Sequence, residues 1–242
     1  MAAAKTILVL PGSTSTACSR KRLPPDFFGA EDALYLERIG HSAAFSLRCE
    51  ARWLLHQGLK HLNLSAPHIT LKHTKEGRPY LSLPYAAVSF SYADHAACLL
   101  AIAQCGQSQA VHVPGIGLDW EKVRMHHLPF IPQGLDAGMT APAKLDQKNC
   151  MAAAQEKLVQ WCRLEAVCKA AGSGLTREAL LEMDAGIVLS DAAHDGTHDA
   201  GTAFLSGRPY TWKTVPLPGR THVCVIAAEG IDSLCSVEIV EV

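Results

Sequence analysis

The chain has 242 residues, of which 48% are hydrophobic, and its 22 basic and 23 acidic residues nearly cancel. This length and composition are typical of a globular protein with one large domain or two small ones. The charge balance excludes a general surface for nucleic acid, and no segment approaches the ~20 apolar residues of a membrane span. Nine cysteines without paired spacing favour a reducing, cytoplasmic environment over a disulfide framework.

The first part of the chain predicts one strand and two helices. A short apolar run over residues 6–10, ended by proline and glycine, predicts a strand and is too short for the about 7–15 apolar residues of a signal peptide. Helices are predicted over residues 30–39 and 41–64, the second with the stronger apolar stripe. Arg48 and Arg52 lie one turn apart on another face of that helix, where basic side chains usually form a solvated edge.

Two turns follow these helices. Gly77 and Pro79 indicate a turn between strands, and Arg78 lies between them. Residues 86–103 predict two strands around a polar turn that ends at His95. Taken alone, a charged or imidazole side chain in a turn is most simply a solvated residue.

A polar connector over residues 104–110 precedes a stretch that carries two carboxylates. Asp119 and Glu121 are two positions apart, so in an extended segment their side chains point the same way. Two like charges so close are favourable only if a cation joins them, and hard oxygen ligands suit Mg²⁺. An Asp-x-Glu pair by itself is usually a solvated strand edge.

The stretch Lys157–Leu175 predicts a helix that ends at Gly172. Glu165 lies in or beside the apolar face of this helix, and Lys169 follows one turn later, where the two side chains can meet. A carboxylate on the buried side of a helix costs free energy unless a positive charge neutralises it. Lys169 and a bound metal ion are the two candidates, and a solvated Glu/Lys pair is the simple alternative.

The remaining segments predict a long loop and a repeated turn. Residues 125–150 are rich in proline and glycine and predict a loop, of a length that is often functional. The sequence GRPY occurs at residues 77–80 and again at 207–210, each time followed by a turn and an apolar strand. This echo favours two related halves.

A histidine- and aspartate-rich segment lies at residues 190–201. Its side chains repeat at a spacing of four and could ligate a transition metal, although glycines and small polar residues on both sides favour a solvated loop. The four residues are His194, Asp195, His198 and Asp199.

Two of these stretches together resemble a known family. GLDWE at residues 117–121 and WCRLEAVCK at residues 161–169 are similar to the signature of the 4′-phosphopantetheinyl transferases, specifically the long, surfactin-synthetase type. The resemblance implies an α+β fold built as a pseudo-two-fold pair of α/β halves, each a small, mostly antiparallel sheet packed with a long helix. We expect the halves at residues 1–110, with the coenzyme contacts, and 111–242, with the metal site and the docking surface.

The resemblance also implies an activity. A cytoplasmic monomer would transfer 4′-phosphopantetheine from coenzyme A to a serine of an acyl or peptidyl carrier protein and release 3′,5′-ADP. Asp119, Glu121 and Glu165 take the positions of the family's Mg²⁺ ligands. Lys169 would hold the phosphate or assist the leaving group, and Glu165 could accept the serine proton, directly or through a metal-bound water.

The resemblance implies five coenzyme A contacts, each made by a basic side chain. Four lie in the first half, and they are Arg48, Arg52, Arg78 and His95. The fifth is Lys169. One departure from the family pattern concerns the lysine before Glu165, because Leu164 stands there and Arg163 precedes it. A shift of one position turns a helical side chain by about 100°. We therefore expect weaker coenzyme binding or altered specificity.

Two other functions compete with the transferase. One is a coenzyme A-binding protein of the same fold that transfers nothing, which the altered lysine and histidine positions suggest. The other is a metal-dependent hydrolase that uses the cluster around His194 and His198. Coenzyme A affinity without carrier modification indicates the first, and tight Zn²⁺ or Mn²⁺ retention without coenzyme affinity indicates the second.

Overall fold

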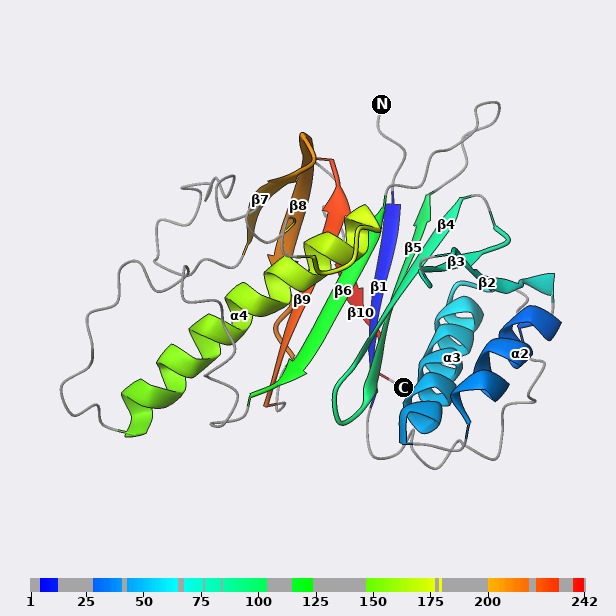
Figure 1. Ribbon diagram of the computed structural model, residues 1–242, viewed down its shortest axis with the longest axis horizontal. Coiled ribbons are helices and arrows are strands. Elements are labelled where there is room, and N and C mark those ends of the chain that lie inside the picture. Colours follow the sequence, from blue (N-terminus) through cyan, green and yellow to red (C-terminus); the bar gives the residue numbers. More distant parts are fainter. Residues whose placement is uncertain are drawn as a thin grey trace.

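A computed structural model describes most of the chain (Figure 1). The described residues are 5–12, 28–40, 43–64, 68–75, 77–83, 85–103, 115–123, 147–176, 179, 200–217, 221–230 and 237–241. Helices and antiparallel sheets occur together within these ranges, so the fold class is α+β, as predicted.

The described part of the first half contains a strand, two helices and two pairs of strands. The predicted helix over residues 30–39 and the predicted first strand are both confirmed, and the second predicted helix is slightly shorter than expected. The elements are β1 (Lys5–Pro11), α2 (Ala30–Ile39), α3 (Ala43–His61), β2 (Leu71–His73), β3 (Pro79–Leu81), β4 (Ala86–Tyr92) and β5 (Ala96–Ala103).

Among its described residues, the second half contains a strand, one long helix and a further set of strands. They are β6 (Ile116–Lys122), α4 (Gln147–Ala171), β7 (Ala200–Leu205), β8 (Arg208–Thr214), β9 (His222–Glu229) and β10 (Val237–Ile239). The prediction of a loop as far as residue 150 is wrong at its end, because α4 already begins at Gln147. Residues 147–154 contain alanine, glutamine and lysine, which favour a helix, and no proline or glycine.

Eight of the ten described strands form two four-stranded sheets with similar connectivity, and β2 and β3 form a separate two-stranded antiparallel sheet. The orders of the four-stranded sheets are β10-β1-β5-β4 and β6-β9-β8-β7, and all neighbours are antiparallel except β1 and β10. In the first sheet, β1 precedes the long helix α3, and β5, which pairs with β4, lies beside β1. In the second sheet, β6 precedes α4, and β9, which pairs with β8, lies beside β6. A two-fold relation between the halves remains a prediction, and β10 at the end of the chain joins the sheet of the first half.

Three clusters of buried side chains form the core. One lies between α3 and the first sheet and includes Leu54 and Leu100, and another lies between α4 and the second sheet and includes Trp212. The third draws residues from both sheets, among them Leu99 and Trp120, and so joins the two halves. The α4 and β6 elements lie side by side at this junction (Figure 1).

Two glycines allow α4 to lie directly on β6. A Cβ atom at Gly117 would be 1.8 Å from the carbonyl oxygen of Ala166, and one at Gly115 would be 2.1 Å from that of Ala170. No other residue tolerates such an approach, since a real Cβ atom would overlap the helix backbone. The glycines therefore set the distance from which α4 side chains reach β6.

Among the described residues, no helix combines the length and the apolar character needed to cross a membrane.

Candidate functional site

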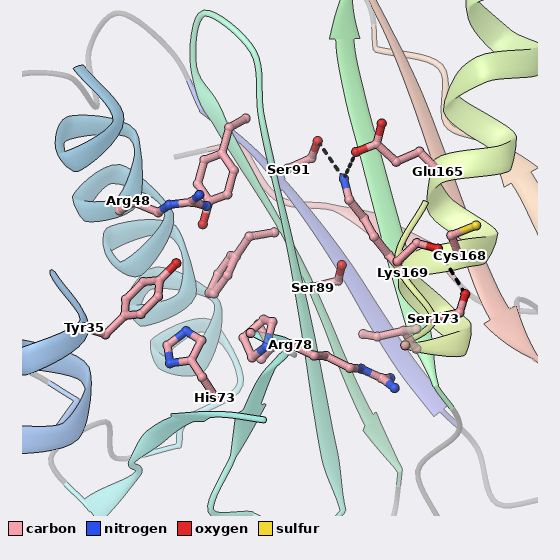
Figure 2. A pocket seen from close by; sticks show the side chains of 18 of the residues that line it. Tyr35, Arg48, His73, Arg78, Ser89, Ser91, Glu165, Cys168, Lys169 and Ser173 are labelled. Atoms are coloured by element: carbon pink, nitrogen blue, oxygen red, sulfur yellow. Dashed lines mark hydrogen bonds and ion pairs between the residues drawn. The ribbon is translucent and has the colours of Figure 1, made fainter. Parts of the chain in front are cut away.

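A cavity with a volume of about 480 Å³ lies where the two halves meet. Its walls come from α2, α3, β4 and the turn before β3 on one side, and from β6 and α4 on the other. Figure 2 shows Arg48 and Tyr35 on one side and Glu165 and Lys169 on the other. Five residues that the sequence predicted as functional line this cavity: Arg48, Arg78, Glu121, Glu165 and Lys169.

The α4 side of the cavity carries a cluster of charged groups around Lys169. The Lys169 Nζ atom lies 2.8 Å from Oδ1 of Asp119 and 3.0 Å from Oε1 of Glu165. Asp119 approaches from β6 and its side chain is 1% exposed, whereas the Lys169 and Glu165 side chains are each 27% exposed. The predicted contact between Glu165 and Lys169 is confirmed, and Asp119 joins it.

The charges in this cluster shift one another's proton affinity. Burial opposes the charged form of Lys169, but the carboxylates of Asp119 and Glu165 outweigh that cost and raise the pKa of the ammonium. Burial also opposes the ionised form of Glu165, and repulsion by Asp119 adds to it, so the pKa of Glu165 is raised although Lys169 acts against the shift. Asp119 is therefore the carboxylate that Lys169 neutralises most directly.

Two serines of β4 fix β6 in place beside the cavity. Ser89 Oγ accepts a hydrogen bond from the Leu118 backbone N–H at 3.1 Å, and Ser91 Oγ accepts one from Trp120 at 3.1 Å. Ser91 also donates its hydroxyl proton to Oδ1 of Asp119 at 3.0 Å. These hydrogen bonds orient the Asp119 carboxylate and join the two halves at the site.

The opposite wall is basic and aromatic. The guanidinium group of Arg48 lies 3.9 Å above the ring centre of Tyr92, which leaves a cationic group facing the cavity. The rings of Tyr35 and His73 stack with their centres 4.1 Å apart. Burial and the nearby Arg52 lower the pKa of His73, so this imidazole is neutral at physiological pH.

Arg78 connects the basic wall to the end of α4. A Cβ atom at Gly172 would lie only 2.9 Å from Nη1 of Arg78, so the guanidinium rests against the C-terminal turn of the helix. Gly172 has a φ of +72°, and its N–H donates to the carbonyl of Lys169, which confirms the predicted glycine stop. Burial lowers the pKa of Arg78, although an arginine remains charged.

Two predicted coenzyme contacts do not line the cavity. Arg52 is 2% exposed, and its Nε atom donates to Oδ2 of Asp32 at 2.8 Å. His95 lies beside Glu50, with Nδ1 3.3 Å from Oε1. The sequence could not show that Arg48 faces the cavity and Arg52 does not, because Asp32, the ion-pair partner of Arg52, lies on a different helix.

The residues before Glu165 point away from the cavity. Leu164 is buried in the core between α4 and the second sheet. The guanidinium of Arg163 lies 5.1 Å above the Trp212 ring, in the same part of the fold. Neither residue lines the cavity. Because Arg163 stands one position before the lysine of the family pattern, this turn of α4 places no basic group at the site.

Carboxylate oxygens are ligands that suit Mg²⁺, but the ammonium of Lys169 lies between the carboxylates of Asp119 and Glu165. Glu121 and Glu165 line this cavity, and Asp119 contacts the same Lys169 ammonium as Glu165. Oδ2 of Asp119 is buried with no hydrogen-bond partner among the described residues. Yet no three or more His, Cys, Asp or Glu side chains of the described ranges converge closely enough to hold a metal ion. Lys169 fills the position between the two carboxylates that do converge.

Several cavity residues were not predicted. Ser89 and Tyr35 looked like ordinary strand and helix residues, and Ser91 was assigned to a turn although β4 continues through it. His73 precedes the GRPY turn, which was the only signal near it. The cluster of His194, Asp195, His198 and Asp199, together with most of the predicted 125–150 loop, lies outside the described residues.

Comparison with known proteins found no match: no model of a protein family matches the chain, and no curated protein matches it significantly.

Proposed function

We propose that the protein transfers 4′-phosphopantetheine from coenzyme A to a serine of an acyl or peptidyl carrier protein. The observation that carries this proposal is the convergence of Asp119, Glu165 and Lys169 at one end of a cavity whose other wall holds Arg48 and Arg78. Such a cavity suits a ligand that carries several phosphates and has its reacting centre near the carboxylates. The contacts of Lys169 with both Asp119 and Glu165, three residues of the signature, support this proposal.

The reaction breaks a phosphoanhydride bond of coenzyme A and forms a phosphoester bond to the carrier serine. The serine hydroxyl oxygen of the carrier attacks the phosphorus that bears the pantetheine arm, and the bond from that phosphorus to the bridging oxygen breaks. The leaving group is 3′,5′-ADP, which keeps the bridging oxygen and its electron pair. The serine proton must pass to a base, and negative charge grows on the leaving phosphate.

The side chains on the cavity walls have distinct parts in this proposal. Arg48 and Arg78 bind and orient the phosphates of coenzyme A. Glu165 accepts the serine proton, a role that suits a carboxylate whose pKa is raised by burial and by Asp119. Lys169 stabilises the charge that grows on the leaving group.

The resemblance implies that Mg²⁺ would be held by Asp119, Glu121 and Glu165, and these three side chains would have to come closer together than they lie in the structure. When bound, the ion would supply a positive charge beside the diphosphate. The proposal also includes the finer features that the resemblance implies. These are a pseudo-two-fold relation between the halves, a monomeric state, a cytoplasmic location and a carrier-docking surface in the second half.

Two substitutions test this function. Asp119→Ala and Glu165→Ala should each abolish Mg²⁺-dependent labelling of a carrier protein by a fluorescent coenzyme A. Glu156→Ala is the matched control, because Glu156 is an exposed residue of the same helix. Labelling that persists in both cavity variants, at the level of the control, would reject the assignment.

A second function has one observation in its favour. Because Arg163 packs on Trp212 and Leu164 is buried, the cavity lacks the basic residue that the family pattern places before the glutamate. A protein of this kind could bind coenzyme A without transferring any group. Calorimetry would then detect coenzyme A binding that Arg48→Ala weakens, whereas no carrier protein would gain mass.

A further inference from the structure

The ammonium group of Lys169 lies in a cage of four oxygen atoms. In addition to Asp119 and Glu165, it donates to the backbone carbonyl of Leu118 at 3.0 Å and lies 3.4 Å from Oγ of Ser91. The four atoms come from β4, β6 and α4, so three elements meet around one positive charge. Carboxylate, carbonyl and hydroxyl oxygens are also the ligands that a hard cation takes.

The cage contains more negative charge than the lysine neutralises. Two carboxylates share one ammonium, and Oδ2 of Asp119 is buried with no hydrogen-bond partner among the described residues. The thiol of Cys162 lies beside this carboxylate, and burial followed by the charge of Asp119 raises the pKa of the thiol, so it remains neutral. A divalent ion could neutralise both carboxylates, whereas the ammonium neutralises one and leaves a negative charge whenever Glu165 is ionised.

We propose that Lys169 is a tethered counter-ion, which holds the cation position between Asp119 and Glu165 until a divalent ion displaces it. After the displacement, the ammonium would bind the diphosphate of coenzyme A. The identity of this ligand rests on the proposed function. The lysine cannot simply leave, because the buried carboxylate of Asp119 beside the half-buried Glu165 would then lack a positive partner and would destabilise the fold. Departure of the ammonium and entry of the metal ion are therefore linked.

This exchange has a measurable consequence for the metal. Because the ammonium and the divalent ion exclude each other, Lys169 lowers the metal affinity of the empty cavity. An anion that attracts the ammonium toward the basic wall removes that competition and strengthens metal binding. By linkage, the metal strengthens binding of the anion by the same factor.

The direct test measures Mn²⁺ affinity without coenzyme A, by electron paramagnetic resonance of the free ion. Lys169→Gln removes the charge and keeps a hydrogen-bond donor, and it should bind Mn²⁺ at least tenfold more tightly than the wild type. Adding Asp119→Asn to that variant should abolish the gain. Lys157→Gln is the control, because Lys157 belongs to the same helix and does not line the cavity. Equal affinity of wild type and Lys169→Gln, or absence of Mn²⁺ binding from both, would overturn the inference.

A second measurement uses the intact lysine and so does not depend on a charge-deleted variant folding. The ¹³Cε resonance of Lys169, assigned through its loss in Lys169→Arg, should shift when Mg²⁺ is added. A resonance that stays in place while Mg²⁺ saturates the protein would also overturn the inference. Neither readout involves transfer, so a displaced lysine in a protein that modifies no carrier would support this inference and refute the proposed function.

Discussion

Two buried ion clusters, one in each half, differ in how completely they are satisfied. In the first half, Arg52 and Asp32 are 2% and 3% exposed and form two side-chain contacts with each other. In the second half, Lys169 forms ion pairs with two carboxylates, and its side chain is 27% exposed and lines a cavity. Both clusters contain charged residues on helices, and the resemblance implied a coenzyme A contact for Arg52 in the first and for Lys169 in the second.

The difference shows which buried charges can act on a ligand. A guanidinium fully paired with a carboxylate has no remaining donor directed at the cavity, so Arg52 and Asp32 join α2 to α3. The Lys169 cluster has an unmatched carboxylate oxygen and an opening to solvent, so it can exchange its counter-ion. Four predictions follow from the contrast, in order of decreasing effect on stability.

The sealed cluster should be costly to break. Asp32→Ala leaves the Arg52 guanidinium buried without its partner and should lower the free energy of unfolding by about 3–5 kcal/mol. Urea denaturation measures this loss, and Glu31→Ala, at the exposed neighbouring position, should cost less than about 0.5 kcal/mol. A loss for Asp32→Ala as small as that of the control would contradict the structural role.

The close packing of α4 on β6 should be the next most sensitive feature. Gly117→Ala would place a Cβ atom against the backbone of Ala166, so α4 must shift, at a cost of about 1–3 kcal/mol and with loss of carrier labelling. In Gly58→Ala, the new atom would meet the ends of leucine side chains at 3.1–3.3 Å, which can adjust. Equal stability and activity of these two variants would contradict the proposed role of Gly117.

A third ion cluster, of intermediate exposure, should show a pH dependence. Asp94 lies 2.6 Å from both Lys122 Nζ and His222 Nε2, and these partners outweigh burial and lower the pKa of Asp94. Its contribution to stability is present above the ordinary aspartate pKa of 3.8 and is lost as pH falls toward the depressed value. Asp94→Asn should thus cost about 1–2 kcal/mol at pH 7 and measurably less at pH 3, with the remainder lost only as the pH falls further.

The measurement for Asp94 is the free energy of unfolding of wild type and variant across that pH range. Glu156→Gln, at an exposed site on α4, provides the control and should change neither value. A cost that is the same at pH 7 and pH 3 would mean that the carboxylate charge contributes nothing.

The open cluster should respond to pH in the opposite direction and more weakly. The pKa of Glu165 is raised, so its contribution to stability is present below the ordinary glutamate pKa of 4.5 and is lost as pH rises through the folded value. Relative to wild type, Glu165→Gln should therefore gain stability from pH 4 to pH 8, by less than about 1 kcal/mol because solvent screens the pair. Thermal denaturation at the two pH values measures the change, and a relative loss at pH 8 would contradict it.

Local signals in the sequence predicted a large part of the fold. Composition predicted α2, the spacing of apolar residues predicted α3, and a short apolar run predicted β1. The glycines after α4 predicted where that helix ends. The start of α4 was missed because the preceding prolines and glycines suggested a longer loop. The pairing of β10 with β1 could not be predicted, since it joins strands from opposite ends of the chain.

The candidate site was predictable only where its residues belong to a motif. Asp119, Glu165 and Lys169 were found from spacing and resemblance, and Arg78 from its turn. The pairing of Arg52 with Asp32 and the hydrogen bonds of Ser89 and Ser91 depend on tertiary contacts that no local pattern encodes. For the same reason, the lysine that was expected beside a metal ion could not be predicted to occupy the metal's position.

The central claim is that the cavity around Lys169 transfers a phosphopantetheine group, and intact mass spectrometry of carrier proteins tests it most directly. A panel of acyl and peptidyl carriers would be incubated with coenzyme A, Mg²⁺ and either the wild-type protein or Asp119→Ala. At least one carrier should gain the mass of one phosphopantetheine group with the wild type and remain unmodified with the variant. Unchanged masses across the panel, from a folded protein that binds coenzyme A, would contradict the claim.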